Sequence, residues 1–297
     1  MIRPEVAGVR HRFVQLDDLK MHLAEAGDPS KPLVILLHGF PEFWYSWRHQ
    51  LRALADIAHV VAPDGRGYGE TDKPKTGYKI EQLAADMRDL IALLGAERGD
   101  DKQQAIFVAH DWGGPIAFAL AALYPERVAK LCVLNGPHSV AYARTVAHSF
   151  SQIRKSWYIL MFQVPGLFES AFFKDPKTMM AKMFHGAAVN RSVFPPEETD
   201  IYAEVMAQPG ALKAALAYYR NALGTAWRLK PLSAPLAMPV LVLWGRQDPA
   251  LEAALVDAAR PFCTGSFEVQ WFDGSGHWLQ QEMAAEVNQS LREFITK

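Results

Sequence analysis

Short, continuous apolar runs rich in Val, Ile and Leu recur along the chain, and helical patterns separate several of them. A run without polar alternation predicts a strand that is covered on both faces, as in a parallel sheet. Five runs have this character: LVILLHG (33–39), HVVAPD (59–64), AIFVAH (105–110), VAKLCVLNG (128–136) and PVLVLWG (239–245).

The two ends of the chain add three further strands. Residues 9–16 and 20–27 alternate between apolar and polar positions, which predicts an antiparallel hairpin that turns at Asp17 and Asp18. A last strand is expected at 266–272. Strands that alternate with helices predict a mostly parallel, doubly wound α/β sheet of about eight strands. The helical patterns occupy 81–95, 115–125 and 282–296.

One long interval breaks this alternation. From about 137 to 235 no strand is expected, and helical segments rich in Trp, Tyr, Phe and Met follow one another. An all-helical insertion after the sixth strand would cover the carboxyl ends of the parallel strands and wall a ligand pocket there. We therefore predict a core formed by 1–136 and 236–297, and a helical cap formed by 137–235.

Composition narrows the classes of function. The chain has 297 residues, half of them hydrophobic, and its 31 Lys and Arg nearly balance its 32 Asp and Glu. Because the basic residues are scattered, we expect no nucleic-acid partner. No apolar stretch approaches the ~18 residues of a membrane span, and the N-terminus lacks the apolar core of a signal peptide. A cytoplasmic protein without a membrane span is expected.

Residue spacing does not favour metal or thiol chemistry. Cys132 lies inside an apolar run and Cys263 has no partner at motif spacing, so neither a disulfide framework nor a thiolate nucleophile is indicated. The ten histidines never form a ligand pattern such as H-E-x-x-H. We expect no metal and no cofactor.

The strand at 105–110 ends in the stretch VAHDWGG, which has the form of a nucleophile elbow. In such a strand–turn–helix elbow, small residues two positions before and after the nucleophile permit its strained backbone and lift its side chain over the sheet. Here Ala109 and Gly113 flank Asp111. No Ser in the chain has Gly at both of these positions, so a serine esterase or lipase is not expected.

Two other motifs favour a chemical role for Asp111 over the simpler interpretation of a turn residue or helix cap. The motif HGFP follows a central strand, so the backbone amides of Phe40 and Trp112 can pair as an oxyanion hole. Asp248 follows the seventh strand and His277 follows the eighth. This order of two aspartates and a histidine is the hydrolase-fold order of nucleophile, acid and base.

These motifs, in this order, resemble those of the epoxide hydrolases of the α/β-hydrolase fold, which are related to the haloalkane dehalogenases. The resemblance covers most of the chain and rests on HGFPEFW (38–44), DGRGYGETDKP (64–74), VAHDWGG (108–114), WGRQDPAL (244–251) and GSGHW (274–278). Two stretches of the predicted cap, SWYILMFQVPG and AYYRN, are similar to those from which the family draws its paired tyrosines. The resemblance therefore implies roles for Tyr158 and Tyr219, and a cis peptide bond between Phe40 and Pro41.

An aspartate nucleophile restricts the reaction. A carboxylate is ionised at neutral pH and attacks an sp3 carbon that carries a good leaving group, which points to epoxides and alkyl halides. Attack by Asp111 gives an alkyl-enzyme ester. Water activated by His277 then hydrolyses this ester, while Asp248 orients the histidine and the Phe40 and Trp112 amides hold the oxyanion.

The tyrosines distinguish between the two substrate classes. The alkoxide of an opened epoxide needs a proton, which Tyr158 and Tyr219 can supply, whereas a halide leaves as a stable ion. Phe40 stands where haloalkane dehalogenases often carry Asn, and fluoroacetate dehalogenases place Arg where this chain has Trp112. We therefore expect an epoxide hydrolase, a hydrolase acting on ether bonds, that forms vicinal diols. A haloalkane or haloacid dehalogenase is the alternative.

A ligand-binding protein without activity is the second alternative, since the fold also serves non-enzymatic binders in which the triad is degraded. In this chain the nucleophile, acid and base are all present. The expected partners are a small apolar epoxide and water, and the expected assembly is a monomer or homodimer. The residues expected to contact substrate are Phe40, Pro41, Trp112 and Trp157. Cap packing is the alternative role for Trp157, Tyr218 and Trp227.

Overall fold

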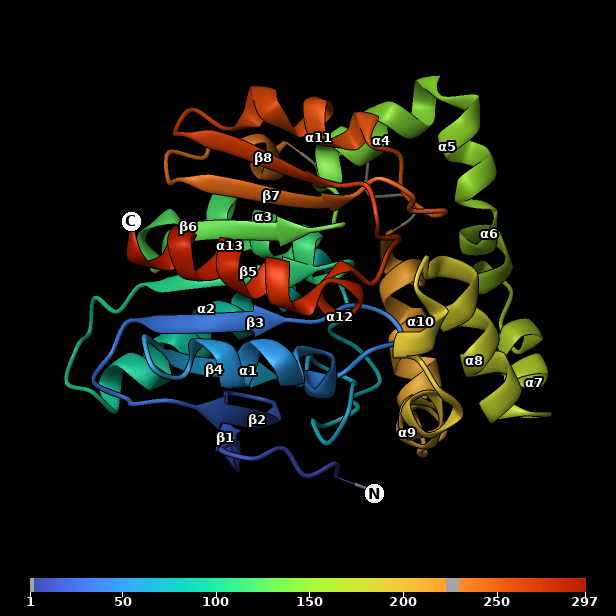
Figure 1. Ribbon diagram of the computed structural model, residues 1–297, viewed down its shortest axis with the longest axis horizontal. Coiled ribbons are helices and arrows are strands. Elements are labelled where there is room, and N and C mark those ends of the chain that lie inside the picture. The colour runs from blue at the N-terminus through green and yellow to red at the C-terminus, as the bar shows by residue number, and fades with distance from the viewer. Residues whose placement is uncertain (1–2, 223–229) are drawn as a thin grey trace.

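A computed structural model describes residues 3–222 and 230–297, in which eight strands form one sheet in the order β1-β2-β4-β3-β5-β6-β7-β8 (Figure 1). β2 pairs antiparallel with β1 and β4, and all other neighbours are parallel. The mostly parallel sheet expected from the apolar runs is therefore confirmed. The strands are β1 (Arg10–Gln15), β2 (Lys20–Ala26), β3 (Leu33–Leu37), β4 (His59–Pro63), β5 (Ala105–His110), β6 (Val128–Leu134), β7 (Val240–Gly245) and β8 (Phe267–Phe272).

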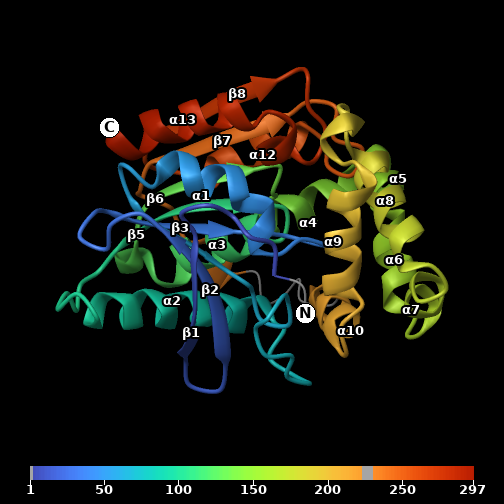
Figure 2. The same cartoon turned by 60° about the horizontal axis from the view of Figure 1, so that its bottom comes forward.

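Helices cover both faces of the sheet (Figure 2). α1 (Arg48–Leu54) and α13 (Ala284–Thr296) pack together on one face, and α2 (Ile80–Ala96) and α3 (Gly113–Leu123) pack together on the other. Because both faces are covered, every residue of β3, β4 and β5 is buried. Among the helices that the structure describes, none has both the length and the apolar character needed to cross a membrane.

The helices between β6 and β7, which we call the helical insertion, lie beyond the carboxyl ends of the parallel strands (Figure 1). In the described part of this stretch no strand occurs, so the expected all-helical insertion is confirmed. The cap boundaries at 137 and 235 stay a prediction, and Trp227 lies outside the described residues. The α-helices are α4 (Ser139–His148), α5 (Phe150–Lys155), α6 (Trp157–Gln163), α7 (Leu167–Phe172), α8 (Pro176–Ala187), α9 (Pro196–Met206) and α10 (Ala211–Ala222).

α3 begins at Gly113, two residues earlier than its apolar pattern predicted. Pro115 stands in the first turn, where a backbone N–H has no intrahelical partner, so this proline does not interrupt the helix. Glycines permit the early start. An added Cβ on Gly113 would lie 2.3 Å from the carbonyl oxygen of Leu37, and one on Gly114 would lie 2.9 Å from the Cα of Gly136. α3 therefore packs directly against the chain at the ends of β3 and β6.

Replacement of Gly113 by Ala should lower the free energy of unfolding by roughly 1–3 kcal/mol or more, because the added methyl group meets backbone rather than a flexible side chain. Gly186 in α8 is the matched control, since an added Cβ there has no heavy atom within 4 Å. Gly186→Ala should leave that free energy unchanged or raise it by up to ~1 kcal/mol. Equilibrium urea unfolding measures both. Equal stability of the Gly113→Ala and wild-type proteins would contradict the packing described.

Candidate active site

Asp111 occupies the turn between β5 and α3, where its backbone φ is 49°. A left-handed backbone is uncommon for a residue other than glycine, and small neighbours make room for it here. An added Cβ on Gly39 would lie 2.3 Å from Oδ1 of Asp111, and one on Gly136 would lie 3.0 Å from its carbonyl oxygen. That carbonyl oxygen accepts the Gly114 N–H at 2.9 Å. The turn therefore has the geometry of a nucleophile elbow.

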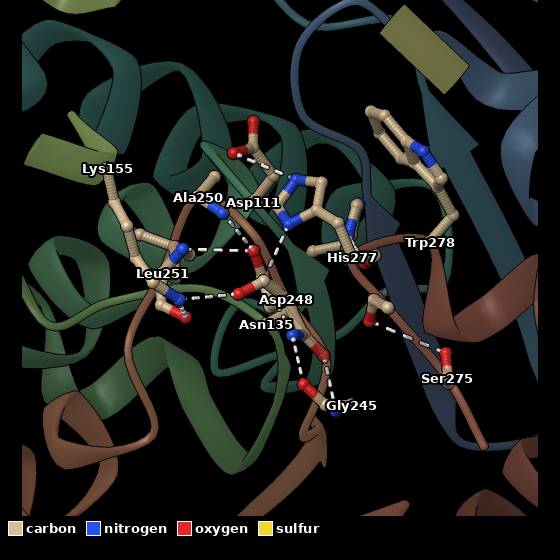
Figure 3. A network of polar contacts seen from close by, with 12 residues as sticks. Asp111, Asn135, Lys155, Gly245, Asp248, Ala250, Leu251, Ser275, His277 and Trp278 are labelled. Atoms are coloured by element: carbon tan, nitrogen blue, oxygen red, sulfur yellow. Dashed lines mark hydrogen bonds and ion pairs between the residues drawn. The ribbon is translucent and has the colours of Figure 1, made fainter. Parts of the chain in front are cut away.

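The two oxygens of the Asp111 carboxylate have different neighbours. Oδ1 accepts the backbone N–H of Phe40 at 2.8 Å. Oδ2 lies 3.5 Å from Nε2 of His277 (Figure 3). The Phe40–Pro41 peptide bond is cis, as the resemblance implied. An amide from the loop after β3 thus holds one carboxylate oxygen, and the histidine faces the other.

A buried carboxylate orients His277 from the opposite side. Nδ1 of His277 is 2.7 Å from Oδ2 of Asp248. Oδ1 of Asp248 accepts the backbone N–H groups of Ala250 at 2.7 Å and of Leu251 at 2.9 Å. The side-chain amide of Asn135 donates to Oδ2 at 2.8 Å (Figure 3). Asp248 is therefore held in place by three donors besides the imidazole.

These contacts shift the pKa values of Asp248 and His277. Burial raises the pKa of Asp248, but the charge and hydrogen bond of His277, together with the hydrogen bonds from Leu251 and Asn135, lower that pKa below its ordinary value. Burial lowers the pKa of His277, yet the charge of Asp248 and hydrogen bonds with both Asp111 and Asp248 raise it well above its ordinary value. His277 therefore holds its proton more strongly than a free imidazole does.

A cavity of about 350 Å³ borders the Asp111 carboxylate. Its wall is mainly apolar, and Trp112, Tyr158 and Tyr219 line it. The ring centroids of Tyr158 and Tyr219 are 6.1 Å apart, and Trp112 meets Tyr219 edge to face at 5.0 Å. α6 and α10 of the helical insertion thus bring both predicted tyrosines to the cavity that the predicted nucleophile borders.

Both tyrosines are neutral at neutral pH. Burial raises the pKa of Tyr158 well above its ordinary value, and the charge of Asp111 raises it further. For Tyr219, burial and the Asp111 charge raise the pKa in the same way, and the neighbouring Trp112 side chain lowers it only in part. Because both phenols keep their protons, either can donate a hydrogen bond or a proton into the cavity.

The structure brings most of the predicted site residues together, but not Trp157. Its side chain is 62% exposed and does not border the cavity, because Tyr158, the next residue of α6, faces inward. This placement corrects the expected substrate contact by Trp157. Substrate contacts by Phe40 and Pro41, and the oxyanion role of the Trp112 amide, stay predictions.

A second buried pair, Glu42 and His110, lies behind His277 and was not predicted. Nδ1 of His110 is 2.7 Å from Oε2 of Glu42, and its Nε2 is 2.8 Å from the carbonyl oxygen of His277. Gln280 and Gln281 each donate a side-chain N–H to Oε1 of Glu42 at 2.9 Å. The signal in the sequence was the Glu of HGFPE and the Gln pair after GHWL. Within 3–222 and 230–297, no group of three or more His, Cys, Asp or Glu could hold a metal ion.

Comparison with known proteins agrees with this geometry. The alpha/beta hydrolase fold family matches residues 32–283. The chain is 35% identical to epoxide hydrolase 4 of Homo sapiens over 294 residues, which cover 96% of this chain and 78% of that protein. It is 36% identical to epoxide hydrolase 1 of Caenorhabditis elegans over 293 residues, which cover 96% of this chain and 70% of that protein.

A solved structure gives the same result in three dimensions. Bacillus megaterium epoxide hydrolase in complex with an inhibitor is similar with a TM-score of 0.83 and 28% identity, covering 96% of this chain and all of that one. Fold, nucleophile elbow and sequence identity therefore lead to one assignment. The chain belongs to the alpha/beta hydrolase fold family.

Proposed function

We propose that this protein is an epoxide hydrolase, which adds water to an epoxide and yields a vicinal diol. The observation that carries the proposal is one cavity shared by the Asp111 carboxylate and two protonated phenols, Tyr158 and Tyr219. A carboxylate attacks carbon and a phenol protonates the departing oxygen, and epoxide opening needs this pair of functions. The relatives and the solved structure described above carry the name epoxide hydrolase.

Opening of the epoxide begins at Asp111. Oδ2, the oxygen that faces His277, attacks a ring carbon, while Oδ1 keeps the Phe40 N–H at 2.8 Å. The bond between this carbon and the epoxide oxygen breaks, and its electron pair moves to the oxygen. Tyr158 or Tyr219 gives that oxygen a proton. The products of this step are a hydroxyalkyl ester of Asp111 and a phenolate in the cavity.

Hydrolysis of the ester depends on His277. Esterification removes the Asp111 charge that helps to raise the pKa of His277, so the imidazolium can pass its proton through water to the phenolate. Neutral His277 then takes a proton from a water molecule whose oxygen attacks the ester carbonyl carbon. The Phe40 and Trp112 amides stabilise the oxyanion. Collapse expels the diol oxygen, which takes the proton of the new carboxyl group, and the Asp111 carboxylate is restored.

Dehalogenation by the same nucleophile is less well supported. A halide leaves as a stable anion and needs N–H donors rather than acids. The cavity instead brings two phenols, Tyr158 and Tyr219, beside the Asp111 carboxylate. The contacts of His277 with both Asp111 and Asp248 also favour an enzyme over a ligand-binding protein without turnover.

Replacement of His277 by Gln should trap the ester. Alkylation of Asp111 remains possible, but no base activates water, so the intact-protein mass should rise by one substrate mass after styrene oxide is added. Peptide mapping should place the added mass on Asp111, and Asp111→Ala should gain none. Normal turnover by the His277→Gln protein, or an adduct on another residue, would refute these roles.

Removal of both phenols should slow ring opening by roughly 100-fold or more, as is typical of general acid catalysis. Tyr158→Phe or Tyr219→Phe alone should keep part of the activity, because the other phenol remains. Tyr142→Phe is the matched control, since Tyr142 also borders the cavity but its hydroxyl is 2.7 Å from Oγ of Ser156. Single turnovers of styrene oxide give the rates. Brisk release of halide from a haloalkane, with full epoxide hydrolysis by the double variant, would instead favour a dehalogenase.

The rate of ester hydrolysis should rise as pH increases through the pKa of His277 in the ester form, and then level off, because only neutral imidazole accepts a proton from water. That pKa should lie below the pKa of His277 in the free enzyme, since the Asp111 charge is gone. Asp248→Asn removes the other carboxylate charge. In this variant the midpoint of the pH dependence of ester hydrolysis should therefore shift to still lower pH. Ester decay followed in single turnovers measures both midpoints. A pH-independent rate in the wild-type protein would contradict the role of His277 as base.

A further inference from the structure

The outward faces of α5, α6 and the start of α7 carry apolar side chains that are exposed to solvent. These side chains recur at every third or fourth position and are between 47% and 81% exposed. In Figure 1 these helices form the margin of the molecule that lies away from the sheet. We call the set the outer stripe. Its members are Phe150, Ile153, Trp157, Leu160, Val164 and Leu167.

The core does not require the outer stripe. Other apolar residues of the same helices, Phe162, Phe168 and Phe172, are buried. Tyr158 and Ile159 border the cavity, so α6 has one face on the cavity and another in water. A group of exposed apolar side chains usually marks a binding surface, whereas single exposed apolar residues do not.

Positive charge accompanies the outer stripe. Residues 137–190 contain six Lys or Arg and two Asp or Glu. The rest of the chain contains 25 Lys or Arg and 30 Asp or Glu. Both acidic side chains are engaged, because Glu169 forms an ion pair within the helical insertion and Asp175 caps α8. Arg154 and Lys174 are exposed, and neither forms an ion pair within the part of the chain that the structure describes. Residues 137–190 therefore have a net excess of Lys and Arg, although Lys177 pairs with Asp200 from outside this range and the whole chain has a net charge of −1.

We propose that the outer stripe docks on an anionic lipid surface. Trp, Phe and Leu side chains on short helices can enter the head-group region to a shallow depth, and nearby Lys and Arg attract anionic head groups. Arg154 lies in sequence between two members of the outer stripe, and Lys174 follows Phe173, which is also exposed. Docking of this kind places the protein on the membrane surface and not across it.

A second copy of this chain fits the outer stripe less well. A two-fold symmetric contact would bring the same basic side chains of both copies together, which opposes association. A standard protein interface also uses roughly 20–30 residues on each side, whereas the outer stripe has six apolar side chains. Apolar side chains can enter a lipid surface to a shallow depth, and the excess of Lys and Arg attracts anionic head groups.

Docking would bring one wall of the cavity close to the lipid. α6 presents Tyr158 to the cavity and Leu160 to the outside, so a single short helix separates the two. Apolar molecules leave water for lipid, so the ligands that an apolar cavity accepts collect at this surface. The docking does not depend on the proposed epoxide chemistry, and its test is independent of turnover.

Flotation of the full chain with lipid vesicles tests the proposal. Vesicles of phosphatidylcholine with phosphatidylglycerol should carry the protein, and vesicles of phosphatidylcholine alone should carry much less. The double variant Phe150→Ser, Leu160→Ser should lower the ratio of bound to free protein by roughly tenfold or more, because two inserting side chains are lost. The double variant Arg154→Gln, Lys174→Gln should lower this ratio by a similar factor on the anionic vesicles only.

The double variant Arg52→Gln, Lys102→Gln is the matched charge control. Both residues are exposed, lie outside the helical insertion and form no ion pair with another described residue. Unchanged binding by this control, together with losses in both test variants, would support the proposal. Absence of binding to anionic vesicles, or an equal loss in the control, would overturn it. One further outcome would overturn the proposal in favour of a second copy. The wild-type protein would form a dimer without lipid, and the Phe150→Ser, Leu160→Ser protein would not.

Discussion

The rest of the site depends on one constraint. Three backbone segments approach one another closely at the carboxyl ends of β3, β5 and β6. Asp111 has a left-handed backbone at this point, and Gly39, Gly113 and Gly136 leave room that no Cβ could share. The same approach places the Phe40 amide 2.8 Å from the carboxylate. The backbone conformation of Asp111 and the Phe40 N–H that binds its carboxylate therefore have a common cause. Neither could shift without the other, because both depend on the same backbone contacts.

The electrostatics of the site follow from this packing. The imidazole of His277 lies between two carboxylates and is largely removed from water, so its proton is retained while both charges are present. In the proposed reaction, esterification of Asp111 removes one charge, so the base becomes effective only after the ester has formed. His110, whose other ring nitrogen pairs with Glu42, binds the backbone carbonyl of His277 from behind. Two buried networks, one on the ring and one on the backbone, thus set the position of this residue.

The helical insertion supplies groups that the sheet does not. Tyr158 on α6 and Tyr219 on α10 border the cavity over the elbow, and burial together with the Asp111 charge keeps their phenols protonated. The charge that would attack carbon therefore also preserves the acids that the departing oxygen needs. The opposite face of α6 belongs to the outer stripe, so this short helix lies between the cavity and the surface that we propose docks on lipid.

Local patterns in the sequence predicted the eight strands and the elbow, because strand burial and turn chemistry depend on neighbouring residues. They also gave the order of the proposed nucleophile, acid and base. The roles of the two tyrosines were predicted from the resemblance of longer stretches to a known family, and not from local periodicity. Only the tertiary structure decided that Tyr158 faces the cavity while Trp157 faces water, since both belong to one apolar segment and packing of α6 selects its inner face. The contact between Glu42 and His110 likewise joins residues 68 positions apart.

The sequence by itself determined which chemical groups and elements are present. Tertiary structure decided which groups meet, because packing and not local conformation sets the distance between side chains of remote segments.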